Sequence, residues 1–213
     1  EVDIRLGIES DYIPGMEPWL EKLHCMASFH HVLGSVHPHL PDYKTRYYHG
    51  DVEAFQKTYF EHLALAAETG LFDTIAHPDL VKNASPLDWH IDRAMTFILP
   101  CLDRIARAGT AMELNTSGLN KALAEMNPGT EMLREMQKRN IPVVIGADAH
   151  DPYRIAQNFT DALDMLSDAG YTHVSMFLDR VRADLPIEQV RSSLKIPATV
   201  RSEFSPRVNP VNK

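Results

Sequence analysis

Two hydrophobic patterns alternate along the chain. Short apolar runs, typical of β-strands, are separated by longer runs in which apolar residues recur every three or four positions, as they do on one face of a helix. Strands are therefore predicted over residues 2–8, 31–36, 74–76, 110–114, 143–145 and 173–177.

Residues that favour helix ends flank the longer runs. Asp51 can cap a helix that ends before Gly70. Ser85 followed by Pro86 predicts the start of a second helix, which ends before Gly109. Further helices are expected over residues 132–139 and 158–169. Such alternation of strands and helices predicts an α/β fold with parallel strands, and both a doubly wound sheet and a β/α barrel fit the pattern.

Metal-capable or strongly polar side chains occur at the ends of five predicted strands. They include Glu9, His37, His77, Asn115, Asp148 and His150. In a β/α barrel the carboxyl ends of the strands meet at one rim, where active sites are assembled. Carboxylates and imidazoles suit a divalent Zn, Mn or Fe ion, so we interpret this rim as a metal site.

Each of these residues is a weak signal when taken alone. A histidine before proline, such as His37 or His77, is more often a loop residue than a ligand. Asp148 and His150 are two positions apart and would face the same side of a strand. The coincidence of five polar strand ends carries the interpretation. Two more histidines near the rim remain as further candidates, His31 and His39.

Composition narrows the class of protein. The 213 residues have a formal net charge of −8 and are 44% hydrophobic, which suits one globular domain and argues against a nucleic-acid backbone as the partner. Only two cysteines occur, Cys25 and Cys101, without the spacing of a metal or disulfide motif. We expect a cytoplasmic protein that does not associate with a membrane.

The motifs together resemble one known family. They are residues 7–15 (GIESDYIPG), 34–37 (GSVH), 76–80 (AHPDL), 113–118 (ELNTSG) and 146–150 (GADAH). The chain is similar to the PHP (polymerase and histidinol phosphatase) family, in its histidinol-phosphatase branch. This resemblance implies a distorted, TIM-like, seven-stranded β/α barrel over residues 1–196 and a C-terminal tail over residues 197–213.

The resemblance also implies a cluster of up to three divalent metal ions, Zn, Mn or Fe. Glu9 would bridge two ions, and His37 and His77 would complete the ligands of one of them. Asp148 would bind the other ion that Glu9 contacts, and His150 would bind the third.

The implied reaction is the hydrolysis of L-histidinol phosphate to L-histidinol and phosphate, in histidine biosynthesis. Clustered cations suit this reaction because they lower the pKa of water to about 7 and stabilise developing charge. The residues implied in catalysis are Glu9, Asp148 and His150. Those expected to bind substrate or support the rim are Asn115, Thr116, Ser117 and Lys121.

Two departures from the family pattern stand out. The family's opening His-x-His strand and two later histidines are missing, because the chain starts at Glu1 within an alternating pattern and without an initiator Met. We therefore expect an incomplete barrel whose function belongs to a longer protein. Asn120, followed by Lys121, stands where the family usually has an arginine that helps to hold phosphate. Lysine lacks the bidentate arginine fork, which leaves the substrate open.

Alternatives to histidinol phosphate hydrolysis remain. One is a phosphoesterase of the same family that acts on another phosphate ester or on nucleotide ends. Another is a catalytically silent, truncated barrel with a binding role. The expected partner is a small-molecule phosphate ester, with a second copy of the chain as a further candidate and no nucleic acid or membrane.

Overall fold

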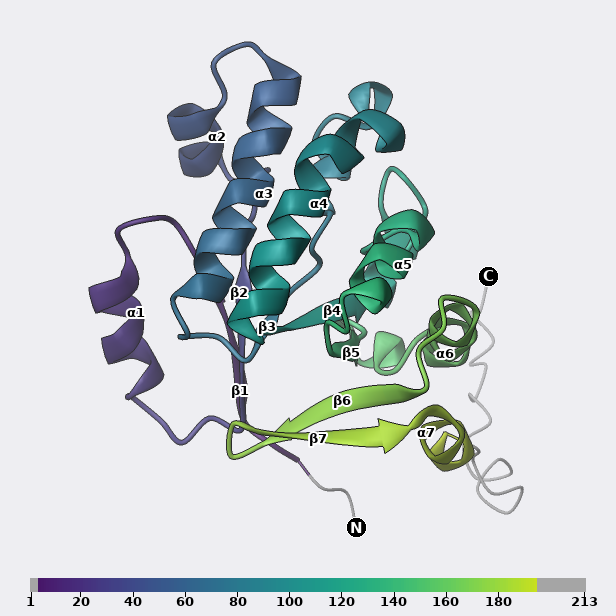
Figure 1. The fold of residues 1–213 in the computed structure, drawn as a ribbon. Helices are drawn as coiled ribbons and strands as arrows, with labels where there is room; N and C mark the ends of the chain where they lie inside the picture. The colour runs from purple at the N-terminus through teal and green to yellow at the C-terminus, as the bar shows by residue number, and fades with distance from the viewer. Residues whose placement is uncertain (1–3, 195–213) are drawn as a thin grey trace, which may run out of the picture.

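The computed structural model describes residues 4–194 of the chain (Figure 1). The strands are β1 (Gly7–Asp11), β2 (His31–Ser35), β3 (Thr74–Ile75), β4 (Ala111–Asn115), β5 (Val143–Gly146), β6 (His173–Leu178) and β7 (Val181–Pro186). The α-helices are α1 (Glu17–His24), α2 (Pro41–Tyr47), α3 (Val52–Glu68), α4 (Ile91–Ala108), α5 (Thr130–Lys138), α6 (Phe159–Asp168) and α7 (Ile187–Ser193). The predicted tail, residues 197–213, and the boundary before it lie outside the described residues.

The first five strands form one parallel sheet in the order β1-β2-β3-β4-β5. Each strand is joined to the next by a helical connection, as the alternating hydrophobic pattern predicts, and the α/β class is confirmed. Within residues 4–194 this sheet is open, with β1 and β5 at its edges.

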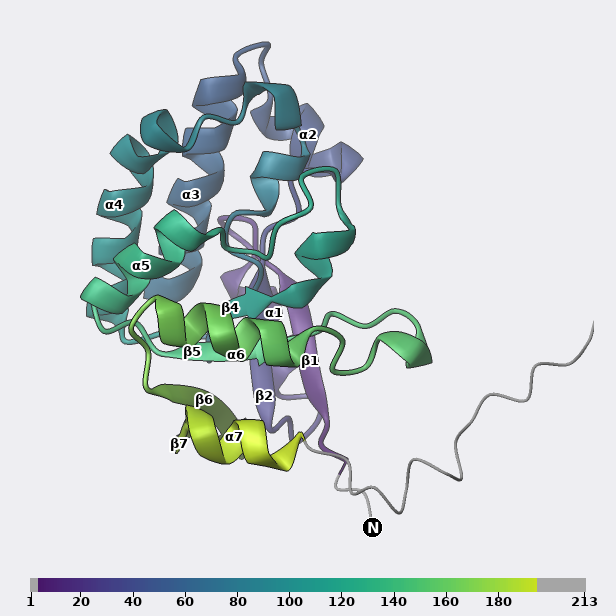
Figure 2. The same cartoon turned by 90° about the vertical axis from the view of Figure 1, so that its right-hand side faces the viewer.

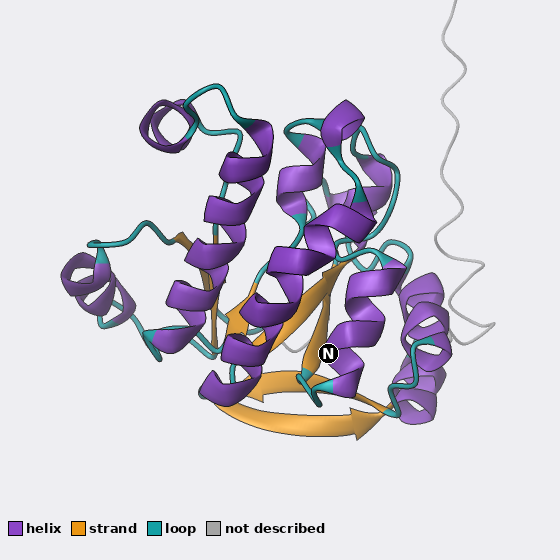
Figure 3. Cartoon of the chain, turned by 45° about the horizontal axis from the view of Figure 1, so that its top comes forward, coloured by secondary structure: helices purple, strands orange, loops and turns teal. Residues whose placement is uncertain are grey.

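Helices cover one face of the sheet. In Figures 1 and 3, α3, α4 and α5 lie side by side over this outer face. Ile75, Met112 and Leu114 are fully buried in the main hydrophobic core. Ile75 and Met112 are register partners and so share this face of the sheet. The pattern of one strand and one amphipathic helix therefore builds a two-layer core.

The inner face of the sheet carries more polar residues. Glu9 is the register partner of Leu33, which in turn pairs with Thr74. Glu113, next to Val144 in β5, continues the same face. Because side chains alternate along a strand, the registers place the carboxylates of β1 and β4 on the side away from the helices.

The predicted position of the first strand is wrong. Residues 4–6 form no strand, and the side chains of Ile4 and Leu6 are 86% and 54% exposed. The strand instead spans Gly7–Asp11, where every residue is paired with β2. The alternation of Ile4 and Leu6 has no core beneath it, whereas the polar residues of β1 lie on a face that holds a site.

The long helices begin and end largely as predicted. The Asp51 carboxylate accepts a hydrogen bond of 3.0 Å from the Ala54 amide and caps α3. Gly109 ends α4 in the left-handed conformation, with φ +74°. The predicted start at Ser85 is wrong, because residues Pro86–Asp88 form a separate 3-10 turn and α4 begins at Ile91. Trp89 and His90, which both have an extended backbone, separate the two elements.

The sixth predicted strand exists, but it does not join the parallel sheet. It pairs antiparallel with β7 as a hairpin, an arrangement the sequence pattern did not predict. At the hairpin turn the Arg180 amide donates to the His30 carbonyl at 3.0 Å, and the Arg180 Nε atom lies 3.1 Å from both Asp73 oxygens. Figure 2 shows the hairpin across the end of the sheet where β1 and β2 begin.

None of the helices in the described part of the chain is both long enough and apolar enough to cross a membrane.

Candidate metal centre

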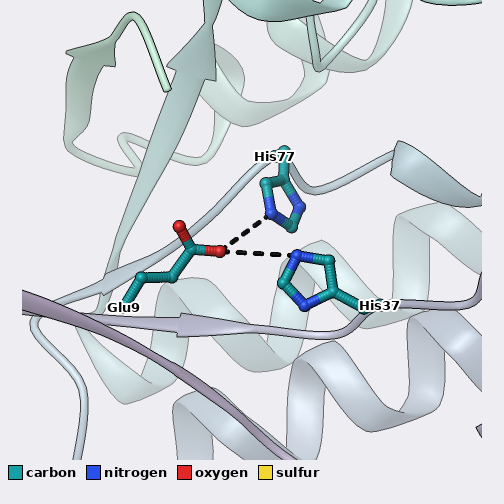
Figure 4. Close-up of side chains that lie close together, drawn as sticks. All are labelled: Glu9, His37 and His77. Carbon is teal, nitrogen blue, oxygen red and sulfur yellow. Dashed lines mark hydrogen bonds and ion pairs between the residues drawn. The ribbon is translucent and has the colours of Figure 1, made fainter. Parts of the chain in front are cut away.

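Three side chains meet at the carboxyl ends of neighbouring strands. Glu9 lies in β1, His37 follows β2 and His77 follows β3. The Nε2 atoms of His77 and His37 lie 3.1 Å and 3.6 Å from the same Glu9 oxygen, Oε1 (Figure 4). One ligand atom from each residue falls within 4.8 Å of the other two. Two imidazoles and a carboxylate at this spacing could share a single divalent cation.

Asp11 sets the orientation of His37. The Nδ1 atom of His37 contacts the Asp11 carboxylate, which also accepts a hydrogen bond of 3.1 Å from Ser35 Oγ. A carboxylate on Nδ1 favours the tautomer whose Nε2 lone pair is free. This is the arrangement that metal-binding histidines use, and in it the lone pair of His37 points toward Glu9.

His77 is held mainly through its backbone. Its side chain is 2% exposed and its φ of +28° is unusual for a residue with a side chain. Its amide donates to Glu113 Oε2 at 2.8 Å, and its carbonyl accepts from the Tyr59 hydroxyl at 3.2 Å. The buried Nδ1 atom has no hydrogen-bond partner.

The electrostatics of the site favour an ionised carboxylate in β1. Burial opposes ionisation of Glu9, but the hydrogen bond with His77 and the electrostatic influence of the His77 and His37 rings outweigh it and lower the Glu9 pKa. The hydrogen bond with His37 lowers the pKa of Asp11. In contrast, burial raises the pKa of Glu113. Glu9 and Asp11 therefore carry the negative charge that a cation would offset.

The three candidate ligands open into a cavity of about 370 Å³. This volume is large enough for a small phosphate ester. Its wall also includes Asp11, Ser35, His39, Leu80, Lys121, Asp148 and His150. The structure thus brings together in one cavity all five residues that the sequence predicts as metal ligands.

Asp148 and His150 stand apart from the other three predicted ligands. Asp148 has φ +46° and accepts a hydrogen bond of 3.0 Å from Ser117 Oγ. Asn115 Nδ2 lies 3.5 Å from the same carboxylate. The His150 side chain is 84% exposed, with Nδ1 3.3 Å from Asp148 Oδ1. Asp148 is braced toward the cavity, whereas His150 lies at its rim.

The predicted substrate-binding residues divide into three kinds. Lys121 lines the cavity. Asn115 and Ser117 are buried and brace Asp148. The Thr116 hydroxyl donates to the Gln157 carbonyl at 2.7 Å and so ties two loops together. Asn120 Nδ2 lies 3.5 Å from the Ser117 carbonyl, within its own 3-10 turn, Thr116–Asn120.

Two acidic residues of the site were not predicted as functional from the sequence. Asp11 orients His37 and Glu113 holds the His77 amide. The signal for Asp11 was present, because it follows Glu9 by two positions on a strand, the same spacing that drew attention to Asp148 and His150. Glu113 lies in the 113–118 motif, two positions before Asn115, but its role was not predicted, because its partner is a backbone group 36 residues away.

A protein of Deinococcus radiodurans with the name "Probable histidinol-phosphatase" is 36% identical to the chain over 176 residues, which cover 79% of the chain and 66% of that protein. The chain belongs to the histidinol-phosphatase family. The resemblance seen in the motifs is thereby confirmed, although no family model matches the chain. The matched part spans about two thirds of the relative's length.

Solved structures share the fold. Histidinol phosphate phosphatase from Lactococcus lactis, in complex with Zn, L-histidinol and phosphate, matches with a TM-score of 0.69 and 16% identity over 85% of this chain and 72% of that one. A Listeria monocytogenes structure also named for histidinol phosphatase matches with a TM-score of 0.64 and 20% identity, over 74% of this chain and 67% of that one. A chain in archaeal ribonuclease P with mature tRNA matches with a TM-score of 0.51 and 18% identity, over 80% of this chain and 62% of that one.

Proposed function

We propose that the protein is a metal-dependent phosphomonoester hydrolase that converts L-histidinol phosphate and water to L-histidinol and phosphate. Membership of the histidinol-phosphatase family supports this substrate. The observation that carries the proposal is the convergence of His37 and His77 on one oxygen of Glu9, with Asp11 behind His37. We assign Glu9, His37 and His77 as ligands of one divalent cation, with zinc as the first candidate.

The donor set fits zinc. Two imidazole nitrogens and one carboxylate oxygen leave a fourth position of a tetrahedral ion open, as in catalytic rather than structural zinc sites. Bound there, the cation would supply a Lewis acid that lowers the pKa of water and offsets the charge of phosphate oxygens. The chain's own residues fix the geometry: Asp11 fixes the His37 tautomer, and burial fixes the position of His77.

Asp148 and His150 extend the site in this proposal. Asp148 would bind a second cation that Glu9 bridges, and His150 would bind a third. Asn115 and Ser117 support Asp148, since their polar hydrogens reach its Oδ2 atom. The exposed His150 ring would have to turn inward to take up its role. Manganese and iron are alternatives to zinc, because His and carboxylate ligands suit all three.

Lys121 is the proposed phosphate-binding cation of the chain. It lines the same cavity as the acidic ligands, and an ammonium group neutralises a phosphate oxygen as a point charge. The neighbouring residue, Asn120, stands where the family usually has an arginine. Its side-chain nitrogen lies near the Ser117 carbonyl. This departure favours a second candidate function, the hydrolysis of a different small phosphate monoester by the same site.

We propose further that the five-stranded sheet is part of a β/α barrel. Support comes from its polar inner face and from a cavity of about 390 Å³ bounded by that face and β6. A closed barrel would cover the edge of β1 and would bury Leu33 and Phe177, which line this cavity. Free thiols at Cys25 and Cys101 suit a cytoplasmic location, and a homo-oligomer is a further candidate assembly.

A substrate panel tests the proposed function. The protein is produced from its complete reading frame, loaded with zinc or manganese, and assayed for phosphate release from L-histidinol phosphate, other amino-alcohol phosphates, sugar phosphates and nucleotides. The proposal expects the highest kcat/KM with L-histidinol phosphate. A higher kcat/KM with another ester would support the second candidate. Zinc binding without turnover of any ester would favour a silent barrel.

A further inference from the structure

A buried carboxylate lies directly behind His77. Glu113, in the middle of β4, is 4% exposed and its side chain is on the inner face of the sheet. Its Oε2 atom accepts hydrogen bonds from the His77 amide at 2.8 Å and from Asn115 Nδ2 at 3.1 Å. The same Asn115 amide group reaches the Asp148 carboxylate. Glu113 thus supports two of the proposed metal ligands, one directly and one through Asn115. It is not itself a proposed ligand.

The neighbouring strand leaves room for this carboxylate. A Cβ atom added at Gly146 in β5 would lie 2.8 Å from Glu113 Cδ and would overlap the Oε1 atom. The φ of Gly146 is not in the left-handed region, so its backbone does not require glycine. The missing side chain therefore provides space, and any larger residue would push the Glu113 carboxylate out of place.

The conformation of His77 needs such a support. A residue with a side chain at φ +28° has a strained backbone, which persists only where its surroundings hold it. Rotation about this φ would carry the imidazole away from Glu9. The Tyr59 hydroxyl donates to the His77 carbonyl, and the His77 amide donates to Glu113. These two hydrogen bonds hold the backbone on both sides of the residue.

We propose that Glu113 is a positioning residue of the metal centre, which holds His77 in its ligating conformation through the backbone amide, and that Gly146 is glycine to admit it. The inference rests on the metal site proposed above. Residues that support metal ligands from behind typically change metal affinity about 10–100-fold when removed. An effect of that size is expected here although Glu113 is not one of the proposed ligands.

Three variants separate positioning from general stability. Glu113→Ala removes the acceptor, Glu113→Gln keeps an acceptor oxygen for the amide, and Gly146→Ala displaces the carboxylate without removing it. The matched control is Asp73→Ala, because Asp73 is a mostly buried carboxylate that accepts from the Val32 amide at 2.8 Å, at the opposite end of the sheet. Asp73→Ala should destabilise the fold and leave the metal centre intact.

The measurement is the dissociation constant for Zn²⁺, by competition with a chromophoric chelator, together with the melting temperature of each metal-free variant. We expect Glu113→Ala and Gly146→Ala to weaken zinc binding about 10-fold or more. Glu113→Gln is expected to stay within about 3-fold of the parent, and Asp73→Ala to leave the constant unchanged while lowering the melting temperature. The amide proton resonance of His77 should change its chemical shift in Glu113→Ala and keep the parental chemical shift in Asp73→Ala.

The inference is overturned if Glu113→Ala changes the zinc constant no more than Asp73→Ala does. If Glu113→Ala does not fold, Gly146→Ala decides alone, and unchanged zinc binding in that variant overturns the inference. A parent protein that binds no zinc overturns the metal site and this inference together. A parent that binds zinc and hydrolyses no ester contradicts the proposed reaction only, and the zinc constants still decide the role of Glu113.

Discussion

Glu9 and His77 meet at 3.1 Å between Oε1 and Nε2, although 68 residues separate them in the chain. The contact exists because β1, β2 and β3 are consecutive parallel neighbours that deliver their carboxyl ends to one place. His37 reaches the same oxygen from the strand between them. The topology of the sheet therefore assembles the candidate metal centre.

Loss of one imidazole should abolish tight zinc binding. We expect His77→Ala to raise the dissociation constant for zinc at least 100-fold, because the site loses one of its three protein ligands. His90→Ala is the control, because His90 is exposed at the start of α4 and does not line the cavity. Equilibrium dialysis with metal analysis measures both. Equal zinc binding by the two variants would refute the assignment of His77.

Removal of the carboxylate behind His37 should weaken metal binding more mildly. Asp11→Asn leaves a group that can still accept a hydrogen bond from His37 Nδ1 but removes the negative charge. We therefore expect the dissociation constant for zinc to rise about 10-fold. The change should appear in metal titration, with an unaltered far-ultraviolet circular dichroism spectrum. A variant with parental zinc affinity would show that Asp11 does not orient His37.

The cavity lysine should act on substrate binding. Lys121→Met removes the cation that we assign to a phosphate oxygen, so KM for L-histidinol phosphate should rise about 10-fold or more while kcat changes less. Lys57→Met is the control, because Lys57 lines a different pocket between α3 and α4. Steady-state kinetics of phosphate release distinguishes the two. A fall in kcat alone would place Lys121 in the chemical step instead.

His62 should make the fold less stable in acid. Burial lowers the pKa of His62 to about 4 from 6.5, and its Nδ1 atom lies 2.8 Å from the Tyr43 hydroxyl. Between these pH values the unfolded chain binds a proton that the folded chain does not. The stabilisation is therefore present above pH 6.5 and is lost as the pH falls toward 4.

Between pH 7 and pH 5 the loss from this one histidine is about 2 kcal/mol. Urea denaturation at both pH values measures it. His62→Gln, which does not titrate in this range, should lose about 2 kcal/mol less than the parent, and the exposed control His90→Gln should behave as the parent does. Equal pH dependence in the parent and His62→Gln would contradict the burial argument.

Most of the sheet followed from the sequence, and the reasons for the exceptions are local. Periodicity found β2, β3, β4 and β5 to within one or two residues because their outer faces are buried under helices. It misplaced β1, since the polar Glu9 and Asp11 lie inside that strand and interrupt the apolar pattern. It missed β7 because that strand is largely exposed and has little hydrophobic signal.

Most of the site residues that act through their side chains were predicted from the sequence, whereas the residue that acts on a backbone amide was missed. His37 and His77 could be picked out as polar residues at strand ends. Glu113 acts on a backbone amide, and a single sequence holds no direct sign of such a contact. Asn115 and Ser117 were predicted near the site, but their observed partner is Asp148, and their contact with substrate stays a prediction.

Phosphate release from L-histidinol phosphate by the zinc-loaded protein, compared with its Glu9→Gln variant, tests the central claim most directly. Glu9 is the shared partner of both imidazoles, so its neutralisation should remove the cation and reduce kcat/KM at least 100-fold, with activity of the parent lost on chelation and restored by added zinc. Turnover that survives both chelation and Glu9→Gln would contradict a metal-dependent hydrolase at this site.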